Sequence, residues 1–285
     1  MRFSMDFQVD STFSKDYRKI LEMFQFDEVS DARGRDVLGK MLPATPLEDL
    51  IAEFERRIRG TWVVVVGSGP SAPKEIELLL DITGGSLTQN VQVIAADGAT
   101  RLLLEEGITP TAVFTDLDGI TSEIMAELSE AGCFFVVHAH GDNISLLKKF
   151  QPEIVQLQWV IGTTQTRPKG PVINPGGFTD GDRILYFLSH FPPDFAILMV
   201  GMDFGPIVGK YSKPTWTTDL PASPFKAQKL QVAVDLLTKL LPTMSHAIYE
   251  LEQGYPFPNV QKLTAEELAV HLEEFTGPRD PPDRE

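Results

Sequence analysis

Two kinds of hydrophobic pattern alternate along most of this chain. Short continuous apolar runs, such as Trp62-Val63-Val64-Val65-Val66, are typical of strands buried on both faces of a sheet. Between these runs, apolar residues recur at helical spacing. The predicted strands cover residues 62–66, 91–95, 112–114, 133–137, 154–160 and 195–200. The predicted helices cover residues 71–80, 99–106, 122–131, 144–150 and 181–191. This alternation predicts an α/β fold with a parallel sheet and right-handed crossovers.

The first 60 residues read as helical and contain no strand-like run. Apolar residues recur at helical spacing from Phe13 to Phe24 and again from Leu47 to Ile58, so we expect a helical segment that covers a neighbouring apolar surface. We therefore predict an N-terminal helical segment (1–60), a Rossmann-like nucleotide- and metal-binding domain with helices on both faces of its sheet (61–276), and a disordered tail (277–285). Within the domain, residues 201–224 are expected to be a loop, and Thr264 and Glu267 form the capping box of a last helix.

Composition excludes several classes of protein. The net charge of −15 at pH 7 disfavours binding to nucleic acid, because the long-range field repels phosphate backbones. Apolar runs are too short for a membrane span, and the first residues lack the hydrophobic stretch of a signal peptide. With Cys133 as its single cysteine, the chain has no internal disulfide framework. We expect a cytoplasmic enzyme with small-molecule substrates, and a homo-oligomer remains possible.

A glycine-rich turn follows the first predicted strand. In Gly67-Ser68-Gly69-Pro70-Ser71, the glycines permit close approach of a phosphate, and the next helix would direct its N–H groups at that phosphate. The same spacing also fits the dinucleotide-binding fingerprint, with Asp97 as the ribose ligand. A plain strand-to-helix turn is the structural alternative.

Carboxylates follow successive predicted strands. Asp116 and Asp118 are two residues apart in Thr115-Asp116-Leu117-Asp118-Gly119, so in extended chain they point the same way, and Asp97 and Asp142 reach the same edge of the sheet. Converging carboxylates repel one another, and a divalent cation resolves this repulsion. The pattern therefore predicts a Mg²⁺ site among these four carboxylates and favours phosphoryl transfer over hydride transfer. Asp118 in a turn and Asp142 with Asn143 in a helix cap are the structural alternatives.

Three further segments carry candidate binding groups. His138 and His140 suit hydrogen bonding near the metal or a structural role, and a zinc site would need Asp142 as a third ligand. The loop Asn174-Pro175-Gly176-Gly177-Phe178-Thr179-Asp180-Gly181-Asp182-Arg183 suggests substrate binding, with Thr179 or Asp180 as the helix cap and Asp182 or Arg183 facing the ligand; a simple glycine-rich loop is the alternative. After Gly201-Met202-Asp203-Phe204-Gly205, cations that can bind phosphate or remain solvated follow at Lys210, Lys213, Lys226 and Lys229.

Taken together and in this order, these motifs resemble those of archaeal-type 6-hydroxymethyl-7,8-dihydropterin diphosphokinases, and more distantly those of thiamine diphosphokinases. The motifs include Ala96-Asp97-Gly98-Ala99 and His138-Ala139-His140-Gly141-Asp142-Asn143. The resemblance implies Mg²⁺-dependent transfer of diphosphate from ATP to a pterin, with AMP as the other product. Gly119 stands where thiamine enzymes have Ser. We expect Asp116, Asp118 and Asp142 to be catalytic and to bind metal, and the ATP-binding set to be Gly67, Ser68, Gly69, Ser71, Asp97, Gly98, His140, Asn143, Gly176, Gly177, Asp182 and Lys226.

Other functions stay open at this point. The module also resembles part of the motility-associated glycosyltransferases, which use nucleotide-sugars. The dinucleotide-binding oxidoreductase remains a second alternative, and a nucleotide sensor without catalysis is a third.

Overall fold

The structure is a computed structural model that describes residues 11–87 and 90–276. Within these residues the main sheet has nine strands, and every pairing in it is parallel. Its strands are β1 (Trp62–Val66), β2 (Val91–Ala96), β3 (Ala112–Thr115), β4 (Phe134–Ala139), β5 (Val160–Thr164), β6 (Val172–Ile173), β7 (Ala196–Val200), β10 (Ala247–Leu251) and β11 (Gln261–Leu263). A small antiparallel pair consists of β8 (Ile207–Val208) and β9 (Leu220–Pro221).

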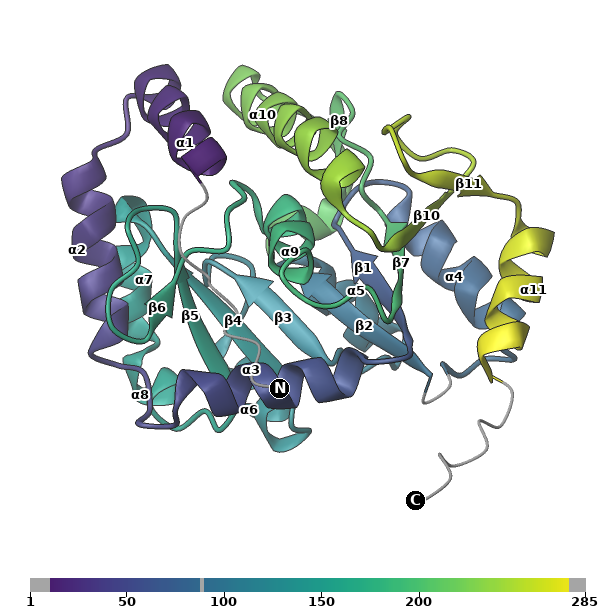
Figure 1. Cartoon of the computed structure of the whole chain (residues 1–285), viewed down its shortest axis with the longest axis horizontal. Coiled ribbons are helices and arrows are strands. Elements are labelled where there is room, and N and C mark those ends of the chain that lie inside the picture. The colour runs from purple at the N-terminus through teal and green to yellow at the C-terminus, as the bar shows by residue number, and fades with distance from the viewer. Residues whose placement is uncertain (1–10, 88–89, 277–285) are drawn as a thin grey trace.

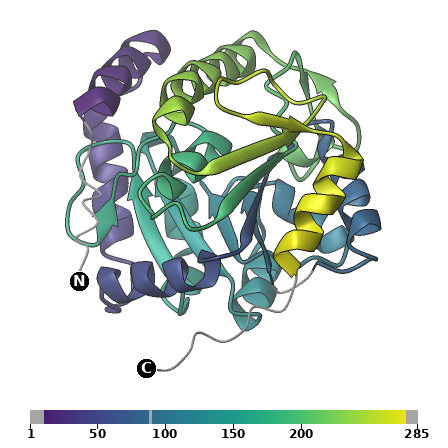
Figure 2. The same cartoon turned by 45° about the vertical axis from the view of Figure 1, so that its right-hand side comes forward.

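Helices cover both faces of this sheet, as the alternating pattern predicts (Figures 1 and 2). The α-helices are α1 (Ser11–Phe24), α2 (Glu28–Gly39), α3 (Leu47–Ile58), α4 (Ala72–Ile82), α5 (Ala99–Glu105), α6 (Ser122–Glu130), α7 (Ile144–Lys149), α8 (Gln151–Ile154), α9 (Asp180–Leu188), α10 (Pro224–Leu240) and α11 (Ala265–Thr276). Short 3₁₀ turns are η1 (Gly141–Asn143), η2 (Lys210–Ser212) and η3 (Leu241–Thr243). None of the described helices combines the length and apolar character needed to cross a bilayer.

The strand order places a crevice at the centre of the sheet. The order is β11-β10-β7-β1-β2-β3-β4-β5-β6, so the chain builds outward from β1 in one direction and then returns to β7 on its other side. Where strand order reverses in this way, the loops at the carboxyl ends of the strands separate and leave room for a ligand. The loops after β1 and β7 lie at this point.

The apolar runs are buried because each strand packs against helices on both faces. In β1, Trp62, Val64 and Val66 join the core under α4, α5, α6 and α11, while Val63 and Val65 join the core under α3, α9 and α10. All five residues of β1 are buried. The run is continuously hydrophobic because neither face of β1 meets solvent, as the pattern predicts.

The N-terminal segment is helical over its described residues, as predicted, and it shares the core of the main domain. α3 places Phe54 against Phe134, Phe187 and Phe191, which lie on the sheet and on α9 and its following turn. α1 lies beside α10 at the top of the molecule (Figures 1 and 2) and packs through Phe13, Tyr17 and Ile20 on Phe178, Val232 and Leu236. α2 was not resolved as a separate helix by the hydrophobic pattern, because its buried face includes Asp31 and Arg35.

One predicted strand is wrong. Residues 154–160 do not form a strand: Ile154 ends the short helix α8, and the strand begins only at Val160. The buried residues Ile154 and Leu157 lie in a turn, in which Leu157 N donates to Ile154 O at 3.2 Å, whereas Val155 is exposed. Pro152, in the first turn of α8, favours this helical start.

Most of the other predicted elements match the structure, and a few elements were not predicted. The remaining predicted strands and helices agree with the structure to within a few residues. The capping box of α11 is present, since Thr264 N donates to Glu267 Oε2 at 2.8 Å and Glu267 N donates to Thr264 Oγ1 at 3.2 Å. The predicted loop ends at Ser223, whose side chain caps α10, so Lys226 and Lys229 lie on a helix that the sequence pattern did not identify. Strands β10 and β11 were also missed. The predicted tail, 277–285, lies outside the described residues.

Candidate active site

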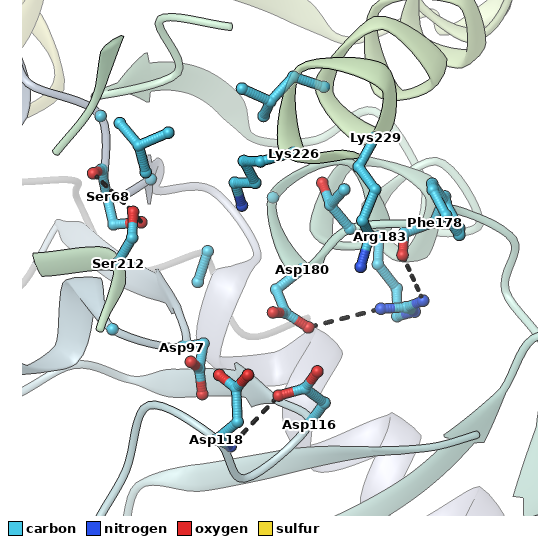
Figure 3. A pocket seen from close by; sticks show the side chains of 18 of the residues that line it. Ser68, Asp97, Asp116, Asp118, Phe178, Asp180, Arg183, Ser212, Lys226 and Lys229 are labelled. Atoms are coloured by element: carbon cyan, nitrogen blue, oxygen red, sulfur yellow. Dashed lines mark hydrogen bonds and ion pairs between the residues drawn. The ribbon is translucent and has the colours of Figure 1, made fainter. Parts of the chain in front are cut away.

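A cleft follows the carboxyl-terminal edge of the sheet (Figure 3). Its acidic floor, after β2 and β3, consists of Asp97, Asp116 and Asp118. Its cationic wall, contributed by α9, α10 and the loop between β7 and α10, consists of Arg183, Lys213, Lys226 and Lys229. One end of the cleft, the glycine-loop end, adjoins Ser68 and Ser212, and the other, the β4–β5 end, adjoins His138, Gln165 and Phe178. Figure 3 shows the aspartates between Ser68 and Ser212 on one side and Arg183 and Phe178 on the other.

The turn after β3 gathers the carboxylates of the floor. Thr115 Oγ1 accepts from Leu117 N at 2.8 Å, and Asp116 Oδ1 accepts from Asp118 N at 3.2 Å. Leu117 has φ of 74°, a conformation that is costly for a branched residue, and its side chain is buried beneath the turn. In consequence Asp97, Asp116 and Asp118 each place a carboxylate oxygen within 4.8 Å of the other two.

A hydrogen bond from Thr115 holds Asp97 in this cluster. It is 6% exposed, has φ of 41°, and accepts a hydrogen bond from Thr115 Oγ1 at 2.5 Å. A Cβ at Gly119 would overlap the Asp97 carboxylate, so the glycine makes room for this acid. Thr115 therefore hydrogen-bonds both to the Asp97 carboxylate and to the turn that carries Asp116 and Asp118.

Electrostatics within the floor are unfavourable as the chain stands. Burial, and then the charges of Asp180 and Asp116, raises the pKa of Asp97 well above its ordinary value. Burial also tends to raise the pKa of Asp116, but hydrogen bonding to His140 and its charge outweigh this effect and bring the pKa to about 2. His140 Nε2 lies 3.5 Å from Asp116 Oδ2. The floor is therefore a place where positive charge would relieve repulsion.

The segment after β4 supports the floor. Asn143 is buried and donates from Nδ2 to the carbonyl oxygens of Asp116 at 2.9 Å and His138 at 2.7 Å, so it holds the chain and does not face the cleft. Asp142 lines the cleft, but its carboxylate lies outside the three-carboxylate cluster. The predicted metal ligands were Asp116, Asp118 and Asp142. The structure instead groups Asp97 with Asp116 and Asp118.

The glycine loop lines the cleft through Gly67, Ser68 and Gly69, but it does not present the expected row of N–H groups. Gly67 N donates to Val200 O at 2.8 Å and Gly69 N to Gly201 O at 2.9 Å. Ser71 N donates to Asp203 Oδ2 at 3.0 Å. The glycines therefore allow close packing against the loop after β7. Gly98 likewise packs on that region, since a Cβ there would overlap Tyr211 O.

The glycine-rich segment before α9 divides its acids between two roles. Asp182 is fully buried and closes a capping box: it accepts from Phe178 N at 2.9 Å and from the N and Oγ1 of Thr179 at 2.5 and 2.6 Å. Gly176 and Gly177 adopt φ of 96° and 85°, and Gly177 lies against the backbone of Arg183. None of Gly176, Gly177 and Asp182 lines the cleft; Asp180 and Arg183 do.

The wall brings cations close to the floor. Lys213 forms an ion pair with Asp118, and Arg183 Nη1 lies 3.5 Å from Asp180 Oδ1. Lys226 and Lys229, on the first turns of α10, point toward the aspartates in Figure 3. Burial, and then the charge of Lys229, lowers the pKa of Lys226. This crowding of like charges indicates a place where an anion would be stabilised.

Several cleft residues were not singled out from the sequence. Asp180 was considered only as a cap, although the Thr179–Asp182 spacing of a capping box already assigns Asp182 to that role and leaves Asp180 free to face the cleft. Phe26, Gln165 and Ser212 also line the cleft. No local motif marks these three, because they come from separate segments that meet only in the folded chain.

Comparisons with known proteins agree with this architecture. The family described as 6-hydroxymethylpterin diphosphokinase MptE-like matches residues 38–208. The chain is 36% identical over 222 residues to the 6-hydroxymethyl-7,8-dihydropterin pyrophosphokinase of Methanothermobacter thermautotrophicus, covering 78% of this chain and 90% of that protein. It is also 36% identical over 236 residues to the protein of that name from Methanocaldococcus jannaschii, covering 79% of this chain and 92% of the other.

A solved structure gives a weaker likeness. A Maf glycosyltransferase from Magnetospirillum magneticum superposes with a TM-score of 0.45 at 16% identity, covering 73% of this chain and 34% of that chain, and this likeness carries no argument about function. The sequence relatives extend along most of both chains at an identity well above that level. The chain therefore belongs to the 6-hydroxymethylpterin diphosphokinase MptE-like family, which confirms the resemblance seen in its motifs.

Proposed function

We propose that this protein transfers a diphosphoryl group from ATP to the hydroxymethyl oxygen of 6-hydroxymethyl-7,8-dihydropterin and releases AMP. Relatives that are named for this activity align with the chain along nearly their whole length. The observation that carries the proposal within the structure is the acidic floor facing a cationic wall in a cleft with two ends. Such a cleft can hold two substrates with the phosphates between them.

The floor fits a hard divalent cation. The oxygens of Asp97, Asp116 and Asp118 converge within 4.8 Å of one another, and carboxylate oxygens are the ligands that Mg²⁺ takes in proteins. Burial, and then the charges of Asp180 and Asp116, raises the pKa of Asp97, and a bound cation would offset these effects. We assign these three aspartates as the Mg²⁺ ligands, with Asp142 facing the cleft beside them. When bound, Mg²⁺ would neutralise phosphate oxygens and favour attack on phosphorus.

The wall would hold the phosphate oxygens against the floor. Lys226 and Lys229 carry ammonium groups on the same face of α10, and Lys213 is already paired with Asp118. Charged donors that converge in a shielded cleft bind phosphate more strongly than the same donors in water. They also stabilise charge that moves to the leaving AMP, so their contribution is to position and to neutralise.

The chemistry requires one proton to be removed. The hydroxymethyl oxygen forms a bond to the β-phosphorus, the bond from that phosphorus to the α–β bridging oxygen breaks, and AMP leaves with the bridging oxygen. Asp180 lies outside the metal cluster, at the wall of the cleft. Burial, and then the charge of Asp116, raises the pKa of Asp180 to about 7. A carboxylate with this pKa is suited to accept the hydroxyl proton.

The direct test is product analysis. The purified chain is incubated with ATP, Mg²⁺ and 6-hydroxymethyl-7,8-dihydropterin, and nucleotides and pterins are separated by chromatography. We expect equal amounts of AMP and pterin diphosphate, with none of either when the pterin is omitted or EDTA is in excess. Formation of ADP, or no pterin-dependent use of ATP, would contradict the proposal.

A further inference from the structure

The β4–β5 end of the cleft contains buried polar atoms without partners. His138 is 2% exposed, and its Nε2 has no hydrogen-bond partner among the described residues. Arg183 is also 2% exposed; its two terminal nitrogens are engaged by Asp180 and by Phe178 O, but its Nε has no such partner. Both side chains line the cleft. Unpaired buried polar atoms are costly, so their presence in a cleft wall points to a ligand that completes them.

The hydrogen bonds around His138 determine what it offers to a ligand. Thr163 Oγ1 lies 3.3 Å from Val137 O and 3.1 Å from His138 Nδ1, so the hydroxyl engages Nδ1 and leaves Nε2 as the ring nitrogen for other partners. Burial, and then the charge of Arg183, holds the pKa of His138 well below its ordinary value. In this neutral ring Nε2 is an acceptor in one tautomer and a donor in the other.

Neighbouring groups extend this pattern. Gln165 is buried and donates from Nε2 to Asp31 Oδ2 at 2.8 Å, which turns its amide oxygen toward the ring of His138. Asp31 is itself held by Tyr17 Oη at 2.6 Å and Gly141 N at 2.7 Å, so Gln165 is fixed by the N-terminal helices. The cleft wall therefore carries polar groups of His138 and Gln165 beside Arg183, whose Nε–H is a donor.

Aromatic surface lies beside these polar groups. Phe26 and Phe178 both line the cleft, with ring centroids 6.4 Å apart and planes inclined by 46°. Flat heterocycles pack well on such rings. A pterin presents amino and ring N–H donors next to a carbonyl acceptor, and these can bond with the polar groups of this wall. The glycine-loop end instead presents serine hydroxyls and backbone that packs closely.

We propose that the pterin ring binds at the β4–β5 end, beside Phe26 and Phe178 and against His138, Gln165 and Arg183, while the nucleoside of ATP binds at the glycine-loop end. This assignment rests on the proposed function and adds to it which end of the cleft takes each substrate. It places the hydroxymethyl group toward the acidic floor. It also gives α1 and α2 a role in substrate recognition, because they hold Phe26, Asp31 and Gln165 in place.

Binding measurements on the full chain test the assignment. His138→Phe keeps an aromatic ring but removes both ring nitrogens, and Phe26→Leu removes aromatic surface. We expect the Kd for 6-hydroxymethyl-7,8-dihydropterin, followed by its fluorescence, to rise at least about tenfold in His138→Phe and several-fold in Phe26→Leu. The Kd for Mg²⁺ with a non-hydrolysable ATP analogue should change by less than about twofold. The matched control is His246→Phe, a buried histidine outside the cleft, which should change neither Kd.

The outcomes separate this assignment from the function on which it rests. Weaker binding of the ATP analogue with unchanged pterin binding would reverse the two ends. Unchanged pterin binding in a folded His138→Phe and in Phe26→Leu would overturn the assignment, even if the wild-type protein makes pterin diphosphate. A wild-type protein that neither binds the pterin nor releases AMP would contradict the proposed function itself.

Discussion

The acidic floor and the cationic wall of the cleft meet across a short gap, yet they are assembled in different ways. Each floor aspartate directly follows a strand or lies in the turn after it, and backbone hydrogen bonds fix their arrangement. The wall residues come from α9, from a long loop and from α10. α10 is placed by packing on α1 and on the segment before α9.

This difference separates local from non-local determinants of a site. The floor depends on strand ends that a parallel sheet must bring to one edge. The wall depends on how well distant helices pack, so we expect it to be the more adjustable half. Accordingly, changes in the floor should affect turnover and metal binding, and changes in the wall should affect mainly the binding of ATP.

The largest effect is expected for Asp116→Asn. The variant keeps the shape of the side chain but removes a charge from the metal cluster, so turnover should fall at least about 100-fold. The free energy of unfolding without metal should fall modestly at pH 7, because the variant loses the favourable pairing with His140 that, despite opposing burial, lowers the pKa of Asp116 to about 2. AMP release and melting temperature with and without Mg²⁺ measure both. A destabilised variant with full activity would mean that Asp116 only shapes its turn.

A smaller effect is expected for Lys226→Met in the wall. Losing one ammonium group should raise the KM for ATP about tenfold and lower kcat less, because the floor remains intact. The control is Lys239→Met on the same helix, whose ammonium pairs with Asp16 at 2.7 Å outside the cleft and which should leave the KM unchanged. If Lys226→Met instead abolished Mg²⁺ binding, the floor and the wall would not be separable.

Asp182→Asn is expected to affect stability alone. The asparagine can still accept one of the bonds from Phe178 N and Thr179, so the free energy of unfolding should fall by about 1 kcal/mol. Activity per folded molecule should stay within about threefold of wild type, since Asp182 does not line the cleft. Denaturant titration beside an AMP assay checks this. A large loss of turnover without destabilisation would place Asp182 in the site.

The smallest effect concerns charges away from both halves. Glu53 on α3 pairs with Arg56 and Arg57, and the hydrogen bond with Arg56, despite some opposing burial, lowers its pKa to about 2. Because its pKa is lower in the folded state, Glu53 stabilises the folded protein at pH values above 4.5, the unfolded pKa. This contribution to the free energy of unfolding disappears as the pH falls toward 2. Because Arg56 is largely exposed, Glu53→Gln should cost less than about 1 kcal/mol at pH 7 and nothing near pH 2, by thermal unfolding.

Much of the fold and half of the site followed from the sequence. The continuous run of β1 and the alternation of strands with helices determined a parallel sheet, and strand-end aspartates were predicted to converge. The strand expected at 154–160 failed because Ile154 ends α8 and Leu157 lies in the turn that follows, so the strand begins only at Val160; apolar content alone does not distinguish such a turn from a strand. α10 was missed because glycine, proline and threonine dominate the segment before it.

The sequence by itself determined that carboxylates gather at one edge of a parallel sheet, because the direction of each strand fixes where its end lies. It did not determine which of them share a cluster. Asp97 joins Asp116 and Asp118 because Thr115 and Gly119 position and admit its carboxylate, whereas Asp182 is taken by a helix cap. Only the tertiary structure decided that Gln165 and Phe26 line this cleft, since their positions depend on packing between segments far apart in the chain.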